Sequence, residues 1–132
     1  MIKRYLFPTM FLLGFFGSAA AQSEDPVDLQ IEDYDETVCY VNCGSSNNLP
    51  EDFITHTYTR VIIQAKADSV TVESVEINRG NCRFIGSMLP QQLNFGEHIT
   101  LIVQKNDTIF AKGCNVIEVS VETDQGEIVF TE

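Results

Sequence analysis

The chain has 132 residues, of which 19 are acidic and 8 are basic, and its formal net charge is −11. A field of this sign repels phosphate backbones and anionic lipid surfaces, which argues against nucleic acid and bare membranes as partners. The length predicts one domain, and an even number of cysteines, four, predicts two disulfides in an oxidising compartment.

Residues 1–21 have the pattern of a signal peptide. Lys3 and Arg4 precede an apolar run over residues 6–16, and small residues at Ala19 and Ala21 fit cleavage before Gln22. The run is shorter than the roughly 20 residues that a membrane-spanning helix needs. Removal of this segment leaves six basic and 19 acidic residues, a net charge of −13. We therefore expect a secreted protein, periplasmic or extracellular, that does not insert into a membrane after signal removal.

Residues 22–52 read as an acidic leader that contains an edge strand and the Cys39/Cys43 loop. The alternation of Val27, Leu29 and Ile31 predicts a strand with one buried face, frayed or solvated by its many carboxylates. The alternative is an acidic segment that docks a basic partner or a divalent cation.

The four cysteines allow three connectivities. The CxxxC spacing of Cys39 and Cys43 is not usual for zinc or for redox chemistry, and a local bridge there would shape a turn. A bridge between Cys82 and Cys114 would close a long loop and stabilise the domain by about 3.7 kcal/mol. The spacing favours Cys39–Cys43 with Cys82–Cys114, but sequence alone leaves the other pairings open.

Residues 53–132 are expected to form the β-sandwich core. Apolar alternation predicts a central strand over 57–66 and a second strand over 70–77 with a β-bulge at Glu73 and Ser74. Gly80 is expected at positive φ in the turn that follows. A short strand over 83–85 and an extended crossing segment over 88–93 come next.

Two hairpins are predicted in the last third of the chain. The first joins the strand over 98–104 to Thr108–Ala111, and the second turns at residues 124–126 with Ile117, Val119 and Val121 facing inward. About seven strands without an amphipathic helix indicate an all-β, antiparallel β-sandwich of immunoglobulin or fibronectin III type. The absence of tryptophan favours the fibronectin III-like variant, and a small closed barrel is the alternative.

The sequence predicts no catalytic, metal or cofactor site. Only His56 and His98 could serve as a histidine base, and no Gly-x-Ser-x-Gly turn presents a nucleophile to either. Both histidines are expected on the surface. We therefore predict that the protein is not an enzyme and carries no cofactor.

Outward-facing side chains offer one candidate for partner binding. Tyr40, Tyr58, Arg60 and Ile62 could form an exposed aromatic and arginine patch of the kind that anchors protein interfaces. Alternatively, Tyr58 and Ile62 pack in the second half of the sandwich or under the leader.

The run Val75–Cys82, which contains Asn-Arg-Gly-Asn-Cys, is followed by Leu89-Pro90, Leu93–Gly96, Gly113–Asn115 and Ile117–Val119. In these blocks the chain resembles a group of small exported enterobacterial proteins that act as interleukin-receptor mimics. The resemblance covers roughly residues 70–130. It implies a fibronectin III-like fold, secretion, a homodimer made by exchange of strands, and a virulence function through binding of host cytokines. Only Cys82 and Cys114 can be carried over, as a structural pair.

The function expected from residues and resemblance together is therefore a secreted, non-catalytic binding protein that engages host interleukins and modulates immune signalling. A structural or assembly β-module of the bacterial periplasm or cell surface, acting by strand addition, is the alternative.

Overall fold

The computed structural model describes residues 3–7, 25–44 and 46–132, the first of these by its backbone alone. Most of the predicted signal segment, including the cleavage site before Gln22, lies outside the described residues. Residues 3–7 form a strand, β1 (Lys3–Phe7), which pairs antiparallel with the last strand of the chain.

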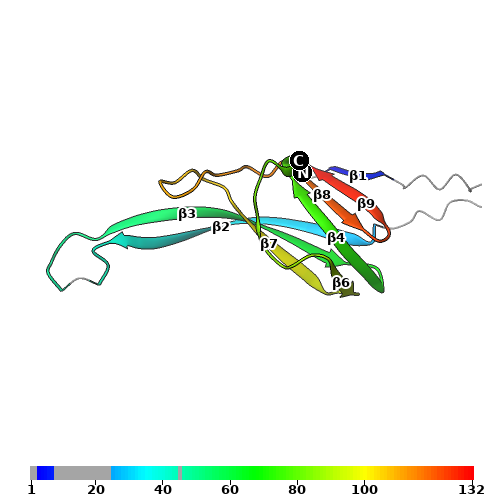
Figure 1. Cartoon of the computed structure of the whole chain (residues 1–132), viewed down its shortest axis with the longest axis horizontal. Coiled ribbons are helices and arrows are strands. Elements are labelled where there is room, and N and C mark those ends of the chain that lie inside the picture. Colours follow the sequence, from blue (N-terminus) through cyan, green and yellow to red (C-terminus); the bar gives the residue numbers. More distant parts are fainter. Residues whose placement is uncertain (1–2, 8–24, 45) are drawn as a thin grey trace, which may run out of the picture.

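The described chain folds into two antiparallel sheets that form a β-sandwich, as predicted (Figure 1). The five-stranded sheet has the order β1-β9-β8-β4-β6, and the four-stranded sheet has the order β2-β3-β7-β5. The elements after β1 are β2 (Val27–Val41), β3 (Asp52–Ala65), β4 (Ser69–Ile77), the 3-10 turn η1 (Asn78–Gly80), β5 (Ile85–Gly86), β6 (Gln91–Asn94), β7 (His98–Gln104), β8 (Glu118–Thr123) and β9 (Gly126–Thr131).

The core lies between the inner faces of the two sheets. Alternate residues of β3, β4, β7, β8 and β9 are buried because successive side chains of a strand point to opposite faces. The fully enclosed side chains include Val61, Ile63, Val70, Val72, Leu101, Val103, Val121 and Ile128. The strands predicted over 57–66 and 98–104 are confirmed, and their alternate residues are buried: Thr59, Val61, Ile63 and Ala65 in β3, and Ile99, Leu101 and Val103 in β7.

Two local predictions in the middle of the chain are also confirmed. The register between β4 and β8 shifts between Val72 and Ser74, which is the predicted β-bulge. Gly80 has φ 86°, and the turn also places Asn78 and Arg79 at positive φ.

The acidic leader is more structured than a solvated segment. β2 is an edge strand, as expected, but it pairs with β3 from Val27 to Val41, and Val27 is fully buried in the core. Leu29 and Ile31 pack against that core. The expected division between residues 52 and 53 therefore cuts through one continuous hairpin.

The predicted hairpin partner over Thr108–Ala111 is wrong. β7 already has β3 on one side and β5 on the other, so no edge is free for a strand there. Residues 105–117 form a loop instead. Ile117, predicted to face inward, is exposed. β8 begins only at Glu118, and Asn78 Oδ1 accepts hydrogen bonds from the backbone N–H groups of Ile117 and Glu118.

Candidate functional site

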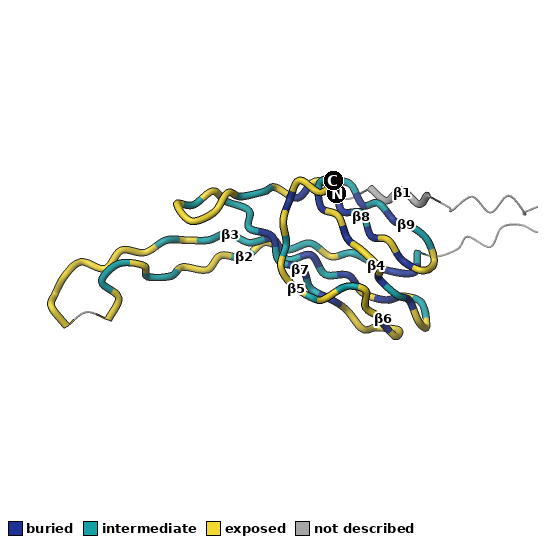
Figure 2. Tube along the Cα trace, viewed as in Figure 1, coloured by how far each residue is buried: buried dark blue, intermediate teal, exposed yellow. Residues whose placement is uncertain are grey.

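The hairpin of β2 and β3 extends well beyond the sandwich (Figure 1). β7 pairs with β3 only from Tyr58 to Gln64, so the part of β3 before Tyr58 is paired with β2 on one side only. We call residues 35–57 the arm. Figure 2 shows that the buried residues gather in the sandwich, whereas the arm is partly or fully exposed along its length.

The tip of the arm is held by local bonds. Cys39 and Cys43 form a disulfide with a Cα–Cα distance of 5.7 Å, which is the pairing that the sequence favoured. The Asn42 side-chain amide donates to the Pro50 carbonyl oxygen at 3.0 Å, across the loop. These two bonds link Cys39 to Cys43 and Asn42 to Pro50 at the end of the hairpin.

The loop over residues 105–117 runs beside the arm and is bonded to it. The Asn106 side chain accepts from the Thr57 N–H at 2.8 Å and donates to the Thr55 carbonyl oxygen at 2.9 Å, and the Lys105 N–H donates to the Thr57 carbonyl oxygen at 2.7 Å. The rings of Tyr40 and Phe110 meet edge to face with centroids 6.0 Å apart. Arm and loop therefore form one structural unit.

This unit exposes an unusual share of large apolar side chains. Six of them are between 43% and 73% exposed. Leaving aside Ile117, which adjoins β8, we call the other five the arm surface: Tyr40, Leu49, Phe53, Ile109 and Phe110. Exposed apolar side chains that gather in one region of a protein commonly mark an interaction site.

The arm is also acidic. It carries Asp35, Glu36, Glu51 and Asp52 and no lysine or arginine. A partner with a basic surface would be attracted to it.

At the base of the arm, an ionic cluster joins the arm to the 105–117 loop. Lys105 Nζ donates to Asp33 Oδ2, and Thr59 Oγ1, which is buried, donates to Asp33 Oδ1 at 2.8 Å. The Lys105 ammonium group, followed by the Thr59 hydroxyl, holds the pKa of Asp33 below its usual value. The same bond raises the pKa of Lys105.

Three of the four residues predicted as a binding patch lie together on the outer face of the four-stranded sheet. Tyr58, Arg60 and Ile62 alternate with the buried residues of β3 and are half-exposed. Tyr40 lies apart from them, and its ring contact is with Phe110 on the arm surface. The predicted patch is therefore divided: Tyr58 shares the outer face with Arg60 and Ile62 and packs against Tyr34 of the acidic leader, whereas Tyr40 lies elsewhere.

Tyr34 completes this outer patch and was missed from the sequence. Its ring lies 5.4 Å from that of Tyr58, and the Arg60 guanidinium lies 4.5 Å above it. Arg60 Nη1 also donates to Glu32 Oε1 at 2.6 Å, and this bond raises the pKa of Arg60. Glu32 and Tyr34 are two residues apart on β2 and therefore point to the same face of the sheet. This spacing could have predicted the patch only once the pairing of Glu32 with Arg60 and of Tyr34 with Tyr58 was known.

His56 and His98 both lie on the same outer face and are separate from each other. The His56 ring stacks on Tyr58 with centroids 5.8 Å apart, and His98 is exposed opposite Gln64. Among the described residues, no group of three or more His, Cys, Asp or Glu side chains is placed to hold a metal ion. That part of the chain also contains no helix long and apolar enough to cross a membrane.

Comparisons with protein-family models, with curated proteins and with solved structures return no match to this chain.

Proposed function

We propose that the protein is a secreted, non-catalytic binding module that engages a host cytokine through the arm and the adjoining 105–117 loop. The observation that carries the proposal is the arm itself, a two-stranded ribbon that projects from the sandwich and displays the arm surface.

An isolated two-stranded hairpin is only marginally stable in water. The arm is supported by a disulfide at its tip, by the contact of Phe110 with Tyr40 next to that disulfide, and by the hydrogen bonds of Asn106 near its base. Five large apolar side chains nevertheless remain in contact with solvent. Burial of such side chains against a partner is favourable by about 1.5–3 kcal/mol for each one that is fully covered. Aromatic anchors of this kind dominate many protein interfaces.

Charge narrows the class of partner. The acidic residues of the arm and the net charge of −13 expected after signal removal would speed encounter with a basic protein and slow encounter with an acidic one. The resemblance to interleukin-receptor mimics supplies the more specific proposal that the partner is an interleukin of the host. It also implies a homodimer made by exchange of strands.

The test is binding of the exported, disulfide-intact protein to a panel of host cytokines at physiological salt, with its mass recorded by light scattering. Saturable binding that Phe53→Ser and Phe110→Ser weaken at least tenfold supports the proposal. Met88→Ser is the matched control, since Met88 is a highly exposed apolar residue outside the arm. Cytokine binding that is unchanged in both arm variants would show that the binding site lies outside the arm. Absence of binding to every cytokine tested would reject the proposal.

One observation favours the alternative, a structural module that acts by strand addition. β1 pairs with the edge of β9 over five residues, from Lys3 opposite Thr131 to Phe7 opposite Glu127. If residues 1–21 are removed on export, this edge becomes available to another strand. Open-ended self-association that Val129→Lys on β9 abolishes would support the alternative, whereas a discrete dimer insensitive to that substitution would contradict it.

A further inference from the structure

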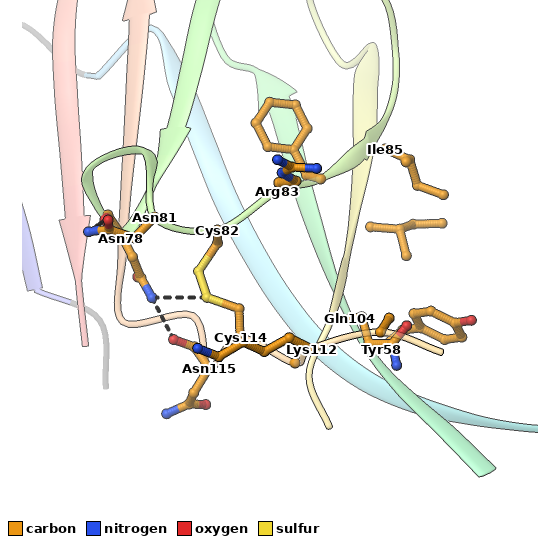
Figure 3. A pocket seen from close by; sticks show the side chains of 14 residues that line it. Tyr58, Asn78, Asn81, Cys82, Arg83, Ile85, Gln104, Lys112, Cys114 and Asn115 are labelled. Atoms are coloured by element: carbon orange, nitrogen blue, oxygen red, sulfur yellow. Dashed lines mark hydrogen bonds between the residues drawn. A yellow bond between two sulfur atoms is a disulfide. The ribbon is translucent and has the colours of Figure 1, made fainter. Parts of the chain in front are cut away.

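A cavity of about 920 Å³ lies on the sandwich, beside the Cys82–Cys114 disulfide (Figure 3). Three segments wall it: residues 78–85 between β4 and β5, the outward side chains of Tyr58, Ile102 and Gln104 on β3 and β7, and residues 111–115. Its size is that of a small-molecule site.

The walls of this cavity are fixed by covalent and polar links. The disulfide joins residues 78–85 to residues 111–115, with the two Cα atoms 5.8 Å apart. Asn78 adds a second link between the same segments, since its Nδ2 donates to the Asn115 carbonyl oxygen at 2.7 Å. The cavity is therefore preformed, which reduces the entropy lost on binding.

The charge of the cavity differs from that of the rest of the protein. Arg83 and Lys112 line it, and no aspartate or glutamate does, although the chain carries 19 of them. Arg83 directly follows Cys82, and Lys112 is two residues before Cys114, so the disulfide links the two wall segments that carry these cations.

These two cations also lack carboxylate partners. Arg60, Arg79 and Lys105 each pair with a carboxylate of the chain. Arg83, Lys112 and Lys66 have no such pair within residues 25–44 and 46–132, and of these three only Lys66 lies away from the cavity. In a protein with such an excess of acid, two unpaired cations at one concave site form a local positive field.

Apolar groups provide the rest of the lining. Phe84, Ile85 and Ile102 contribute side chains, and Ile85 is exposed opposite Ile102 in the β5–β7 pair. A ligand that fits such a lining needs an apolar body beside an anionic group. The planar guanidinium of Arg83 can bind a carboxylate through two parallel hydrogen bonds.

From these observations we propose that the cavity beside the Cys82–Cys114 disulfide is a binding site for a small organic anion, a carboxylate with an apolar body that the positive charges of Arg83 and Lys112 attract. The site shares residues 111–115 with the 105–117 loop but uses none of the five side chains of the arm surface, so binding of a small anion and binding of a cytokine are tested with different substitutions.

The experiment is titration of the exported, oxidised protein with sodium octanoate, followed by calorimetry and by backbone amide shifts. Octylammonium and acetate are the matched probes, the first with the opposite charge and the second without the apolar body. We expect saturable binding of octanoate, shifts confined to residues 78–85, 102–104 and 111–115, and no saturable binding of either control probe.

Substitutions make the test specific. R83Q combined with K112Q should weaken octanoate binding about fivefold or more, the range expected for loss of two exposed charges. Lys66→Gln, which removes an unpaired cation elsewhere, should leave the affinity unchanged, and near-UV circular dichroism should show that both variants are folded. Equal binding of octanoate and octylammonium, an affinity unchanged in the double variant, or no binding of octanoate would each overturn the proposal.

Discussion

Tyr40 on the arm and Phe110 on the 105–117 loop meet edge to face, with ring centroids 6.0 Å apart. These two residues are 70 positions apart in the numbering, and their contact joins two segments that both project from the sandwich. The shape of the candidate binding surface depends on this contact and on the bonds of Asn106 to Thr55 and Thr57.

Phe110→Ala should therefore loosen the arm without unfolding the sandwich. The pair is largely exposed, so its coupling energy is expected at the lower end of the range for aromatic pairs, about 0.5 kcal/mol. A double-mutant cycle with Tyr40→Ala measures this coupling, and hydrogen exchange should quicken at residues 35–41 but not in β4 or β8. Ile109→Ala is the control, because it removes an exposed apolar side chain of the same loop. Uniform exchange changes across the molecule would contradict the assignment.

The ion pair between Asp33 and Lys105 predicts a pH dependence of stability. Because the folded-state pKa of Asp33 is lowered from 3.8, its contribution is fully present above that value and is lost as the pH falls through the folded-state pKa. Lys105 has a raised pKa, so its contribution is lost as the pH rises through a value above 10.5.

Lys105→Met should reduce the free energy of unfolding at pH 7, and the difference from the unsubstituted protein should shrink below about pH 4. Urea unfolding between pH 2.5 and 7 measures this. Lys66→Met serves as the control and should show no such convergence. A difference that stays constant down to pH 2.5 would mean that the aliphatic part of Lys105, rather than its charge, stabilises the fold.

The two disulfides should differ in what they stabilise. The Cys82–Cys114 bond spans 32 positions and the Cys39–Cys43 bond only four. Loop-closure entropy predicts losses of about 3.7 and about 2 kcal/mol, respectively, when each pair is replaced by alanine.

Urea unfolding of the two double-alanine variants tests this order. The Cys39/Cys43 variant should also keep its affinity for octanoate, whereas the Cys82/Cys114 variant should lose it. Equal destabilisation by the two replacements would contradict the role of the longer bridge.

Gly86 and Gly80 together test whether the close approach of β5 to β7 requires a residue without a side chain. Both have positive φ, 151° and 86°, but a Cβ on Gly86 would lie well inside contact with the Thr100 carbonyl oxygen, whereas a Cβ on Gly80 meets nothing within 4 Å. Gly80→Ala should cost about 1 kcal/mol through its backbone conformation alone. Gly86→Ala should cost more, about 2–3 kcal/mol, because it also separates β5 from β7. Thermal unfolding of the two variants measures the difference, and equal shifts would show that β5 can move at no cost.

The sequence predicted the sandwich well where one face of a strand is buried. The alternation of Val61, Ile63 and Ala65 gave the inward set of β3, and the change of parity after Val72 located the bulge of β4. These patterns are informative because the core imposes a period of two on the strand.

The arm could not be predicted in the same way. Residues 35–41 and 52–57 pack against no second sheet, so no burial pattern marks them as strands, and the many carboxylates suggested a solvated leader. The hairpin predicted over 108–111 failed for another reason: β3 pairs along one edge of β7, and β5 occupies Leu101 and Ile102 on the other.

The two sites depend on contacts between distant segments. The patch of Tyr34, Tyr58 and Arg60 requires the register of β2 with β3, and the cavity requires the Cys82–Cys114 bond to bring Arg83 and Lys112 together. The residue types were visible in the sequence, but their proximity follows only from the topology.

The most direct test of the central claim is the affinity of the exported, disulfide-intact protein for host cytokines, measured beside the Phe53→Ser, Phe110→Ser and Met88→Ser variants. We predict saturable binding to at least one interleukin, weakened at least tenfold by each arm substitution and unchanged by the substitution at Met88. Binding that is absent, or that is the same in all four proteins, would contradict the proposal that the arm is the binding surface.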